Sequence, residues 1–408
     1  MNAELFPRNL RSTVFVLPTA WVLFSAAAFA QGVTGHIDHI FPAGGTRGTT
    51  LQIEVVGDDL VGSDAVRVSG EGVTGKVVET KPATKTSKAI AVVELTIDAD
   101  APVGLRDLRL HSPAGFTNRA FFAVGDLPQV RETEPNSLFS QAQQIEKTPV
   151  TIDGQITQAD IDVFRFSAKA GDTIVCRVEA QRLRPFLADG VPGWFQAVMT
   201  LYDTQGRQLA YVDDYYFHPD PVLIFEVPKD GDYVVELRDS IFRGRDDFVY
   251  RLTIGKIPFI TSVFPRGLNP KQKVTVHLDG VNLPSDTVDV VAPDTPRSLL
   301  AVSVEADGIR SNAIPLAVTA PPTTAEKEPN DTPKAAQAVP VPASIDGRIE
   351  KPGDVDFFKI HVSGKQTLAF EVAARRYESP LDSIVTILDA TGKQLAENDD
   401  VEDPFFQH

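Results

Sequence analysis

Stretches of alternating apolar and polar residues run through most of the chain and predict β-strands. Residues 51–55, 233–237 and 274–278 each place an apolar side chain at every second position. Successive side chains of a strand point to opposite faces of the sheet, so this alternation is typical of strands with one buried face. Between the stretches lie glycine, proline, asparagine and aspartate, and 30 prolines with 28 glycines leave little room for long helices. The pattern therefore predicts an all-β protein.

Internal repeats divide the chain into two kinds of module in the order A-B-A-B. The A repeat aligns the segment that begins at Ile37 with the one that begins at Ile260, an offset of 223, and both contain a Phe-Pro-x-Gly string. The B repeat aligns the Glu-Pro-Asn string at 134–136 with the one at 328–330, an offset of 194. Because these offsets differ by 29, the second A module is shorter by about that number of residues. A length of 408 residues suits several domains of roughly 100 to 200 residues.

The repeats predict tandem β-sandwich modules, of which the last is incomplete. After Asp214 of the first B module, 41 residues follow up to Gly255, whereas only 8 follow its counterpart Asp400. The absent residues would include the closing strands, so we expect this module to expose an apolar face and a strand edge. The expected segments are a signal peptide at 1–30, an A module at 33–126, a B module at 131–255, a short A module at 257–319, a proline-rich linker at 320–325 and a truncated B module at 326–408.

The first thirty residues have the features of a secretory signal peptide. Arg8 and Arg11 precede an apolar stretch at 14–28, and residues 28–30 have the small-x-small pattern that signal peptidase cleaves. The alternative is a retained membrane anchor, which Pro18 and the short apolar run disfavour. We therefore expect a protein that is secreted or held at the cell surface, with no membrane span after cleavage.

Charge and cysteine content narrow the expected partners and chemistry. Acidic residues outnumber basic ones by 55 to 39, and the formal net charge is −16 at pH 7. A field of that sign repels phosphate backbones, so nucleic acid is not an expected partner. The single cysteine, Cys176, cannot form an internal disulfide, and it alternates with Ile174 and Val178 as a core residue would. Nothing in the sequence indicates the oligomeric state.

Longer strings in the repeats carry a resemblance to known families. The first B module contains ETEPNSLFSQAQQI and IDGQITQADIDVFRF, and the second contains EKEPNDTPKAAQAV and IDGRIEKPGDVDFFKIHV. On these strings the B modules resemble the bacterial pre-peptidase C-terminal domain, a β-sandwich attached to many secreted proteases and related to the collagen-binding module of clostridial collagenases. The A modules are similar to immunoglobulin-like IPT/TIG domains, on the Phe-Pro-x-Gly and Gly-x-x-Leu patterns. The resemblance implies immunoglobulin-like and jelly-roll-like sandwiches that accompany catalytic domains.

Carboxylate and amide residues recur at the start of each B module and after its Ile-Asp-Gly string. Calcium takes six to eight oxygen ligands, and alternate residues of an extended segment such as 326–330 share one face. In the collagen-binding relatives the corresponding segments bind calcium, so the resemblance implies a calcium site here, the alternative being a solvated acidic linker and a turn. The implied ligands are Glu326, Glu328, Asn330, Asp331, Asp354 and Asp356 in the second B module, and Glu132, Glu134, Asn136, Asp160 and Asp162 in the first, where Ser137 takes the place of Asp331.

Aromatic residues in the first B module form a second candidate site. The offset between the B repeats falls from 194 to 186 between matched strands, so the first module carries eight additional residues there. Together with the aromatic run at 215–217, this region would provide an exposed platform for a polymer such as polysaccharide or a protein fibre. The alternative is that the rings cover the end of the sandwich as core residues. The candidate ligand-binding residues are Trp194, Phe195, Tyr215 and Tyr216.

No catalytic signature accompanies these modules. The chain has no H-E-x-x-H and no G-x-S-x-G string, and His36 and His39 lack the partners of a zinc site, so we expect both at the surface or at a strand end. We therefore expect a secreted, non-catalytic protein whose B modules bind calcium and which binds an extracellular polymer or protein or assists a protease. Two alternatives stay open: a fragment of a larger secreted peptidase whose catalytic domain lies outside this chain, and spacer modules of a cell-surface adhesion protein.

Overall fold

The protein is all-β, as the sequence pattern predicts. The computed structural model describes residues 34–400 apart from residues 159, 186–192 and 297–298, so the expected signal peptide lies outside the described residues. Within this part of the chain the helical segments are two short 3₁₀-helices, η1 (Phe139–Gln141) and η2 (Arg375–Tyr377). None of the described helices has the length and apolar character that a membrane crossing needs.

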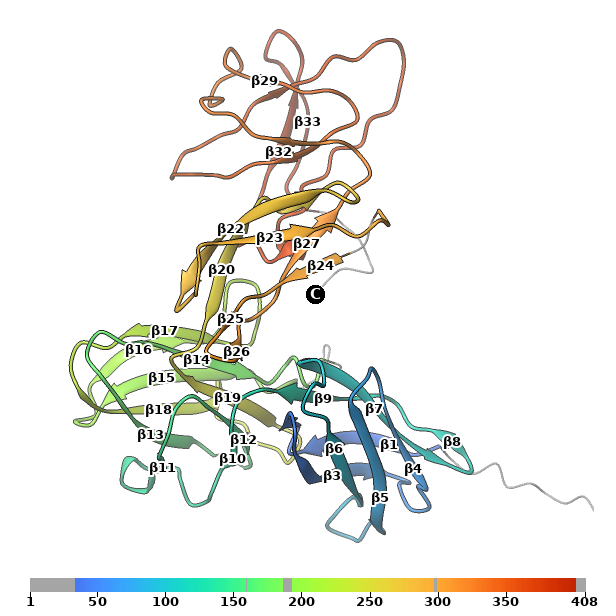
Figure 1. The fold of residues 1–408 in the computed structure, drawn as a ribbon, viewed down its shortest axis with the longest axis vertical. Coiled ribbons are helices and arrows are strands. Elements are labelled where there is room, and N and C mark those ends of the chain that lie inside the picture. The colour runs from blue at the N-terminus through green and yellow to red at the C-terminus, as the bar shows by residue number, and fades with distance from the viewer. Residues whose placement is uncertain (1–33, 159, 186–192, 297–298, 401–408) are drawn as a thin grey trace, which may run out of the picture.

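The first A module is a sandwich of two four-stranded sheets (Figure 1). One sheet has the strand order β1-β3-β6-β5 and the other β2-β9-β7-β4, with β8 paired to β7. In β3 the side chains of Ile53 and Val55 are buried and the alternate residues Gln52 and Glu54 are exposed, as the alternation predicts. The strands are β1 (His36–Phe41), β2 (Gly44–Thr46), β3 (Thr50–Asp58), β4 (Ala65–Val68), β5 (Val73–Lys81), β6 (Ala89–Ile97), β7 (Gly104–Ser112), β8 (Gly115–Phe116) and β9 (Ala120–Gly125).

The first B module is a sandwich of two five-stranded sheets, ordered β10-β12-β19-β14-β17 and β11-β13-β18-β15-β16. Cys176 is fully buried between them, and burial raises the pKa of its thiol to about 12, so it is a core residue as expected. The strands β18 and β19 lie in the middle of their sheets, each bonded to a strand on both sides. The strands are β10 (Gln129–Arg131), β11 (Gln143–Ile145), β12 (Val150–Gln155), β13 (Asp162–Ala168), β14 (Thr173–Glu179), β15 (Ala197–Asp203), β16 (Gln208–Val212), β17 (Val222–Glu226), β18 (Gly231–Asp239) and β19 (Val249–Gly255).

The second A module is a smaller sandwich with sheets β20-β22-β23 and β21-β27-β24 and a hairpin β25-β26. Its parallel pair places Gly267 opposite Ala317, as the first A module places Gly44 opposite Ala123. The repeated Phe-Pro-x-Gly string therefore leads into the same kind of parallel edge in both copies. The strands are β20 (Phe259–Phe264), β21 (Gly267–Leu268), β22 (Lys273–Val281), β23 (Thr287–Val291), β24 (Leu299–Val302), β25 (Glu305–Ala306), β26 (Ile309–Arg310) and β27 (Ile314–Val318).

The second B module forms three separate pairs of strands, β28-β30, β29-β31 and β32-β33, and its ribbon is mostly without arrows (Figure 1). Among its described residues no strand takes the places of β18 and β19. Phe370, the counterpart of the fully buried Cys176, is consequently 49% exposed. Residues 323–325, which we assigned to a linker, form β28 and pair with β30. The strands are β28 (Thr323–Ala325), β29 (Gln337–Ala338), β30 (Ser344–Asp346), β31 (Phe358–Lys359), β32 (Val385–Leu388) and β33 (Gln394–Asn398).

Apolar contacts join neighbouring modules. Leu183 and Val249 of the first B module belong to the same apolar cluster as the core of the first A module. At the next junction Leu127, Val175, Ile257 and Phe259 form a small cluster of their own. These junctions bury apolar side chains, so the first three modules are packed against one another rather than tethered by linkers.

Candidate metal centres and ligand surfaces

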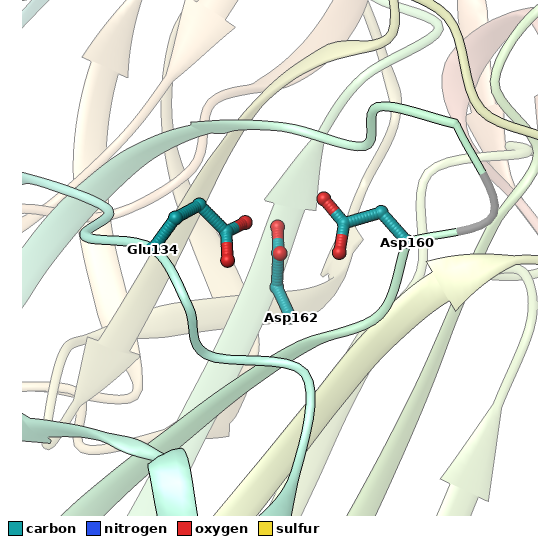
Figure 2. Close-up of side chains that lie close together, drawn as sticks. All are labelled: Glu134, Asp160 and Asp162. Atoms are coloured by element: carbon teal, nitrogen blue, oxygen red, sulfur yellow. The ribbon is translucent and has the colours of Figure 1, made fainter.

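Three carboxylates of the first B module converge at one end of the sandwich. Glu134 follows β10, Asp160 precedes β13 and Asp162 is the first residue of β13. One oxygen atom of each carboxylate lies within 4.8 Å of an oxygen of the other two. Figure 2 shows the three side chains pointing toward one another, Glu134 from the segment after β10 and the two aspartates from the segment that enters β13. Three of the five residues expected to bind metal here are therefore brought together.

Glu132 lies beside this group and is held by the backbone and by Tyr250. Its carboxylate accepts a hydrogen bond from the backbone N–H of Gln155 at 2.7 Å, and Tyr250 Oη lies 3.0 Å from Glu132 Oε2 and 2.5 Å from Asp162 Oδ2. The single hydroxyl proton can be donated to only one of the two carboxylates at a time. A Cβ atom on Gly154 would lie 2.2 Å from both Glu132 Oε2 and the Tyr250 ring, so only glycine fits this position of the Ile-Asp-Gly string.

Several oxygen atoms of this site are buried without a hydrogen-bond partner. Asn136 is fully buried and neither its Oδ1 nor its Nδ2 has a partner, and Asp162 Oδ1 is also without one. Buried polar groups are nearly always hydrogen-bonded, so such atoms call for a water molecule or an ion. Burial, together with the neighbouring Glu132 carboxylate, raises the pKa of Asp162, and burial also raises the pKa of Glu132. A cation would relieve both the repulsion and the missing contacts.

The second B module gathers a larger acidic group at the equivalent place. Asn330 is fully buried, donates from Nδ2 to Glu326 Oε1 at 2.9 Å and leaves its Oδ1 without a partner. Two other buried oxygen atoms, Asp354 Oδ1 and Asp356 Oδ1, also lack partners. Burial raises the pKa of Asp356 to about 7, with the Glu326 carboxylate contributing to the shift. The carboxylates lie within 4.8 Å of one another as two sets that share one residue: Glu326, Glu328 and Asp356, and Glu328, Asp331 and Asp354.

The two acidic groups differ at one position that the repeat alignment singles out. In the first module Ser137 Oγ donates a hydrogen bond to Asp160 Oδ1 at 3.1 Å. In the second, Asp331 supplies a further carboxylate, which lies 3.6 Å from Lys351 Nζ. Both groups contain carboxylate and amide oxygens and no imidazole or thiolate, which is the ligand chemistry of calcium rather than of zinc. The residues present therefore fit calcium in both modules.

The four candidate aromatic residues do not share one surface. Phe195 is buried in the core of the first B module, where its ring stacks on Phe248 with the centroids 5.4 Å apart. The expectation that Phe195 is exposed is therefore wrong, because its ring fills the space between the two sheets. Trp194 is half-buried beside it, and its backbone carbonyl accepts a hydrogen bond from Arg243 Nη2 at 2.9 Å.

The other two candidates lie at the junction with the second A module. Tyr215 packs edge to face against Phe259 of β20, with the centroids 5.5 Å apart, so this ring serves the junction. Tyr216 adopts a positive φ of 56° and is 48% exposed. Of the four predicted ligand-binding residues, only Tyr216 therefore has the exposure that a platform needs.

The sequence predicts the wrong position for His39 and does not identify Tyr250 as part of the first acidic group. His39 is only 6% exposed, so the expectation of a surface or strand-end position is wrong. Leu183 and Arg184 of the first B module line the same crevice as His39, and no local pattern around residue 39 reveals this neighbourhood. Tyr250 was missed because its partner Asp162 is 88 residues away in sequence. The one available signal was the repeated Ile-Asp-Gly string, whose glycine makes room for the Tyr250 ring.

Comparisons with known proteins give one partial relative in sequence. No family model matches the chain. A probable subtilase-type serine protease of Deinococcus radiodurans is 31% identical over 134 residues, which are 30% of this chain and 17% of the protease. The chain thus spans less than a fifth of that protein's length.

Among solved structures the likenesses are weak. SGBP-B of the mixed-linkage glucan utilization locus of Bacteroides ovatus, solved with a mixed-linkage heptasaccharide, is 10% identical with a TM-score of 0.18, covering 53% of this chain and 74% of that one. SGBP-B from a complex xyloglucan utilization locus of Bacteroides uniformis is 9% identical with a TM-score of 0.18, covering 55% and 74%. At these scores the likenesses carry no argument about function.

Proposed function

We propose that this chain is a secreted or cell-surface, non-catalytic accessory protein whose two B modules bind calcium. The observation that carries the proposal is the set of buried oxygens without partners, Asn136 Oδ1 and Asp162 Oδ1 in one copy and Asn330 Oδ1 in the other, each beside converging carboxylates. Two independent copies with the same feature at equivalent positions argue for a shared ligand. The resemblance of the B modules to calcium-binding pre-peptidase C-terminal domains supports the same reading.

In each B module, several residues would contribute to binding the calcium ion. In the first B module Glu134, Asp160 and Asp162 converge and would supply carboxylate oxygens, and Asn136 would supply an amide oxygen. Glu132 is engaged by the Gln155 backbone N–H, so it fixes the end of β10 next to the site. A bound calcium ion would supply positive charge that neutralises the carboxylates and ties the segment after β10 to the start of β13.

The partial likeness to a subtilase-type protease favours an association with extracellular proteolysis over other accessory roles. We propose that the modules act beside a protease or its protein substrate rather than as a catalyst. A fragment of a larger secreted peptidase and spacer modules of an adhesion protein are the two competing assignments. The purified chain is expected to hydrolyse neither casein nor gelatin, and turnover that a point substitution within these modules abolishes would overturn the non-catalytic assignment.

Isothermal titration of the full chain with calcium tests the metal assignment directly. We expect two sites with dissociation constants of about 10⁻⁴ to 10⁻³ M, the range of extracellular calcium modules. The double variant Glu134→Gln, Asp162→Asn should lose one site, and Glu328→Gln, Asp356→Asn should lose the other. Glu226→Gln changes an exposed carboxylate of β17 remote from both groups and serves as the matched control. If the wild-type chain binds no calcium, the metal assignment is wrong and both acidic groups are solvated acidic segments.

Thermal unfolding gives an independent measurement of the same binding. A ligand that binds only the folded state at about one hundred times its dissociation constant adds roughly 2.7 kcal/mol to the free energy of unfolding. The wild-type chain should therefore melt at a higher temperature in excess calcium than in chelator, and the Glu226→Gln control should respond as the wild type does. Identical melting of the wild type in both conditions contradicts the proposal.

A further inference from the structure

A crevice of about 340 Å³ lies between the first A module and the first B module. Its size falls in the range of small-molecule sites, which occur preferentially where two domains meet. One wall is formed by β1 and by residues 118–121, and the other by Leu183, Arg184 and Val249. Leu183 and Val249 are part of the apolar cluster of the A module, so packing on both sides holds the walls in place.

Cationic side chains line this crevice in a protein of net charge −16. Arg184 lies largely buried and contacts Asp247, with Nη1 and Oδ2 2.9 Å apart. Arg119 lines the same crevice, and its guanidinium lies over the ring of Phe121 at 5.2 Å from the centroid. Asp38 is the one carboxylate among the described lining residues, and Lys88 Nζ lies 3.2 Å from it. The lining therefore favours an anionic group beside an apolar wall.

His39 gives a second, independent indication of a ligand. It lines the crevice, is only 6% exposed, and its Nδ1 has no hydrogen-bond partner. Burial and the nearby Arg184 lower the pKa of His39 to about 4, so the imidazole is neutral near pH 7 and keeps both a donor and an acceptor nitrogen. A buried polar atom without a hydrogen-bond partner destabilises the folded state, and a ligand that forms a hydrogen bond with this atom removes that cost.

The second A–B junction shows that the scaffold does not require these side chains. In both copies an asparagine after the last hairpin binds the first strand in the same way: Asn118 pairs with the backbone N–H and carbonyl of Ile37, and Asn312 does so with Ile260. The polar crevice residues instead differ between the copies. Aligned at the offsets of 223 and 194, Ser262 stands for His39, Ala313 for Arg119 and Glu378 for Arg184. The second junction places a different arginine, Arg266, against its B module, where the guanidinium donates a hydrogen bond to the Tyr377 carbonyl. The set of His39, Arg119 and Arg184 is therefore particular to the first junction.

We propose that this crevice binds a small organic carboxylate with an apolar body. The carboxylate faces Arg119 and Arg184, a polar atom of the ligand meets the His39 imidazole, and the apolar body lies against Leu183 and Val249. This site is separate from the calcium groups and does not depend on them. Two sources share this chemistry, a free acid and the C-terminal residue of a peptide.

Calorimetric titration of the full chain with 3-phenylpropanoate and with 3-phenylpropanamide tests the proposal. The two probes have the same shape and differ in charge, and we expect the acid to bind at least about tenfold more tightly, a difference of ~1.4 kcal/mol. Arg184→Met should weaken binding of the acid by a similar factor. Arg67→Met changes an arginine of β4, which is separated from β9 by β7 and contributes no residue to the crevice lining, and should leave binding unchanged. N-acetylphenylalanine and its amide extend the comparison to a peptide C-terminus.

Equal binding of acid and amide by the wild-type chain, or no binding of either acid at millimolar concentration, overturns the proposal. Binding of 3-phenylpropanoate alone identifies a free acid as the ligand class, and preference for N-acetylphenylalanine identifies a peptide end. If Arg184→Met does not fold because its contact with Asp247 is lost, Arg119→Met provides the second variant. Wild-type affinity in both arginine variants also contradicts the assignment.

Discussion

The two B modules carry the same repeat but form very different amounts of sheet. In the first, β18 and β19 lie in the middle of the two sheets, and the core around Cys176 is closed. In the second, residues 323–400 form three isolated strand pairs, and Phe370 at the position of Cys176 is half exposed. The acidic groups converge in both modules nevertheless. The comparison teaches that the candidate metal centre is assembled by the opening segment and the first strands, whereas the core needs the two central strands.

The two junctions between an A module and the following B module also differ, because β19 has no counterpart among the described residues of the second B module. In the first, Asp153 accepts a hydrogen bond from Arg251 of β19 at 2.9 Å, both side chains are buried, and the guanidinium lies so close to Gly44 that no side chain fits there. In the second, Asp346 is the counterpart of Asp153 and accepts directly from the backbone N–H of Gly267 at 2.8 Å. Because none of the described residues of the second B module forms a strand in the place of β19, the same aspartate contacts the neighbouring module without an intervening arginine.

The largest expected difference between the B modules is in hydrogen exchange. Amides of β18 and β19 should exchange only by global unfolding, which costs about 5 to 15 kcal/mol in ordinary domains, whereas open strand pairs exchange by local fluctuations of nearly zero cost. Exchange followed by mass spectrometry on the full chain measures both modules at once. Protection of residues 344–400 as strong as that of residues 152–254 would show that the second module is closed by another route.

The second expected difference concerns the aspartates of the two junctions. Asp153→Ala removes the 2.9 Å hydrogen bond of the buried Arg251 guanidinium and leaves it the Glu179 carboxylate, 4.0 Å from Nε. We expect a loss toward the lower end of the roughly 3 to 5 kcal/mol that breaking a buried ion pair costs, about 3 kcal/mol. Asp346→Ala removes hydrogen bonds to two backbone N–H groups, those of Arg266 and Gly267, and should cost about 1 to 3 kcal/mol. Urea unfolding of the two variants compares them. If Asp346→Ala lowers the free energy of unfolding more than Asp153→Ala does, the Asp153–Arg251 pair stabilises the protein less than the hydrogen bonds of Asp346 to the backbone.

Much of the fold follows from the sequence because its causes are local. The alternation at residues 51–55 predicts the half-buried strand β3, and it depends only on which residues are apolar. The repeats also identify Glu134, Asp160 and Asp162 as neighbours, because a duplicated spacing of acidic residues reflects a duplicated structure. Calcium binding itself stays a prediction, since it rests on these residues and on a resemblance.

The errors arise where a residue's surroundings come from distant segments. Phe195 looked like part of an exposed insertion, but its ring meets Phe248 of a loop more than fifty residues later. His39 lines a crevice together with Leu183 and Arg184, which belong to another module. Sequence alternation indicates that a strand has two faces, but it does not indicate which other segment covers each face. The sequence alone therefore does not predict these contacts.

The third expected difference is a pH dependence confined to the first junction. The pKa of His39 is lowered from 6.5 to about 4, by burial first and by Arg184 second, while Asp247, Asp38 and Asp246 oppose the shift. Between these two pH values the unfolded state binds more protons than the folded state, so stability falls as the pH falls through this window. The full shift corresponds to about 3 kcal/mol, reached below pH 4.

Urea unfolding of the first A and B modules within the full chain, measured at pH 7 and at pH 4.5, checks this dependence. His39→Leu cannot take up a proton and should lose the His39 contribution, while the Ser262→Ala variant at the equivalent position of the second junction should keep it. An unchanged pH profile in His39→Leu would show that the acid sensitivity of the junction comes from its carboxylates.

The smallest expected difference tests how tightly the two Ile-Asp-Gly strings are packed. A Cβ atom on Gly154 would lie 2.2 Å from Glu132 Oε2 and from the Tyr250 ring, and Tyr250 is fully buried inside the closed sandwich. Gly154→Ala should therefore destabilise the first B module by about 1 to 3 kcal/mol, the usual cost of overpacking. The counterpart Gly347 would meet only Glu326 Oε2, at 2.8 Å, and no tyrosine strand lies behind that carboxylate among the described residues. Glu326 is only half-buried, and its carboxylate can move at the cost of its hydrogen bonds from Asn330 Nδ2 and from the Arg348 backbone N–H. Gly347→Ala should therefore cost less than Gly154→Ala. Thermal unfolding of the two variants in chelator separates these outcomes, and equal losses would mean that Tyr250 does not confine Glu132.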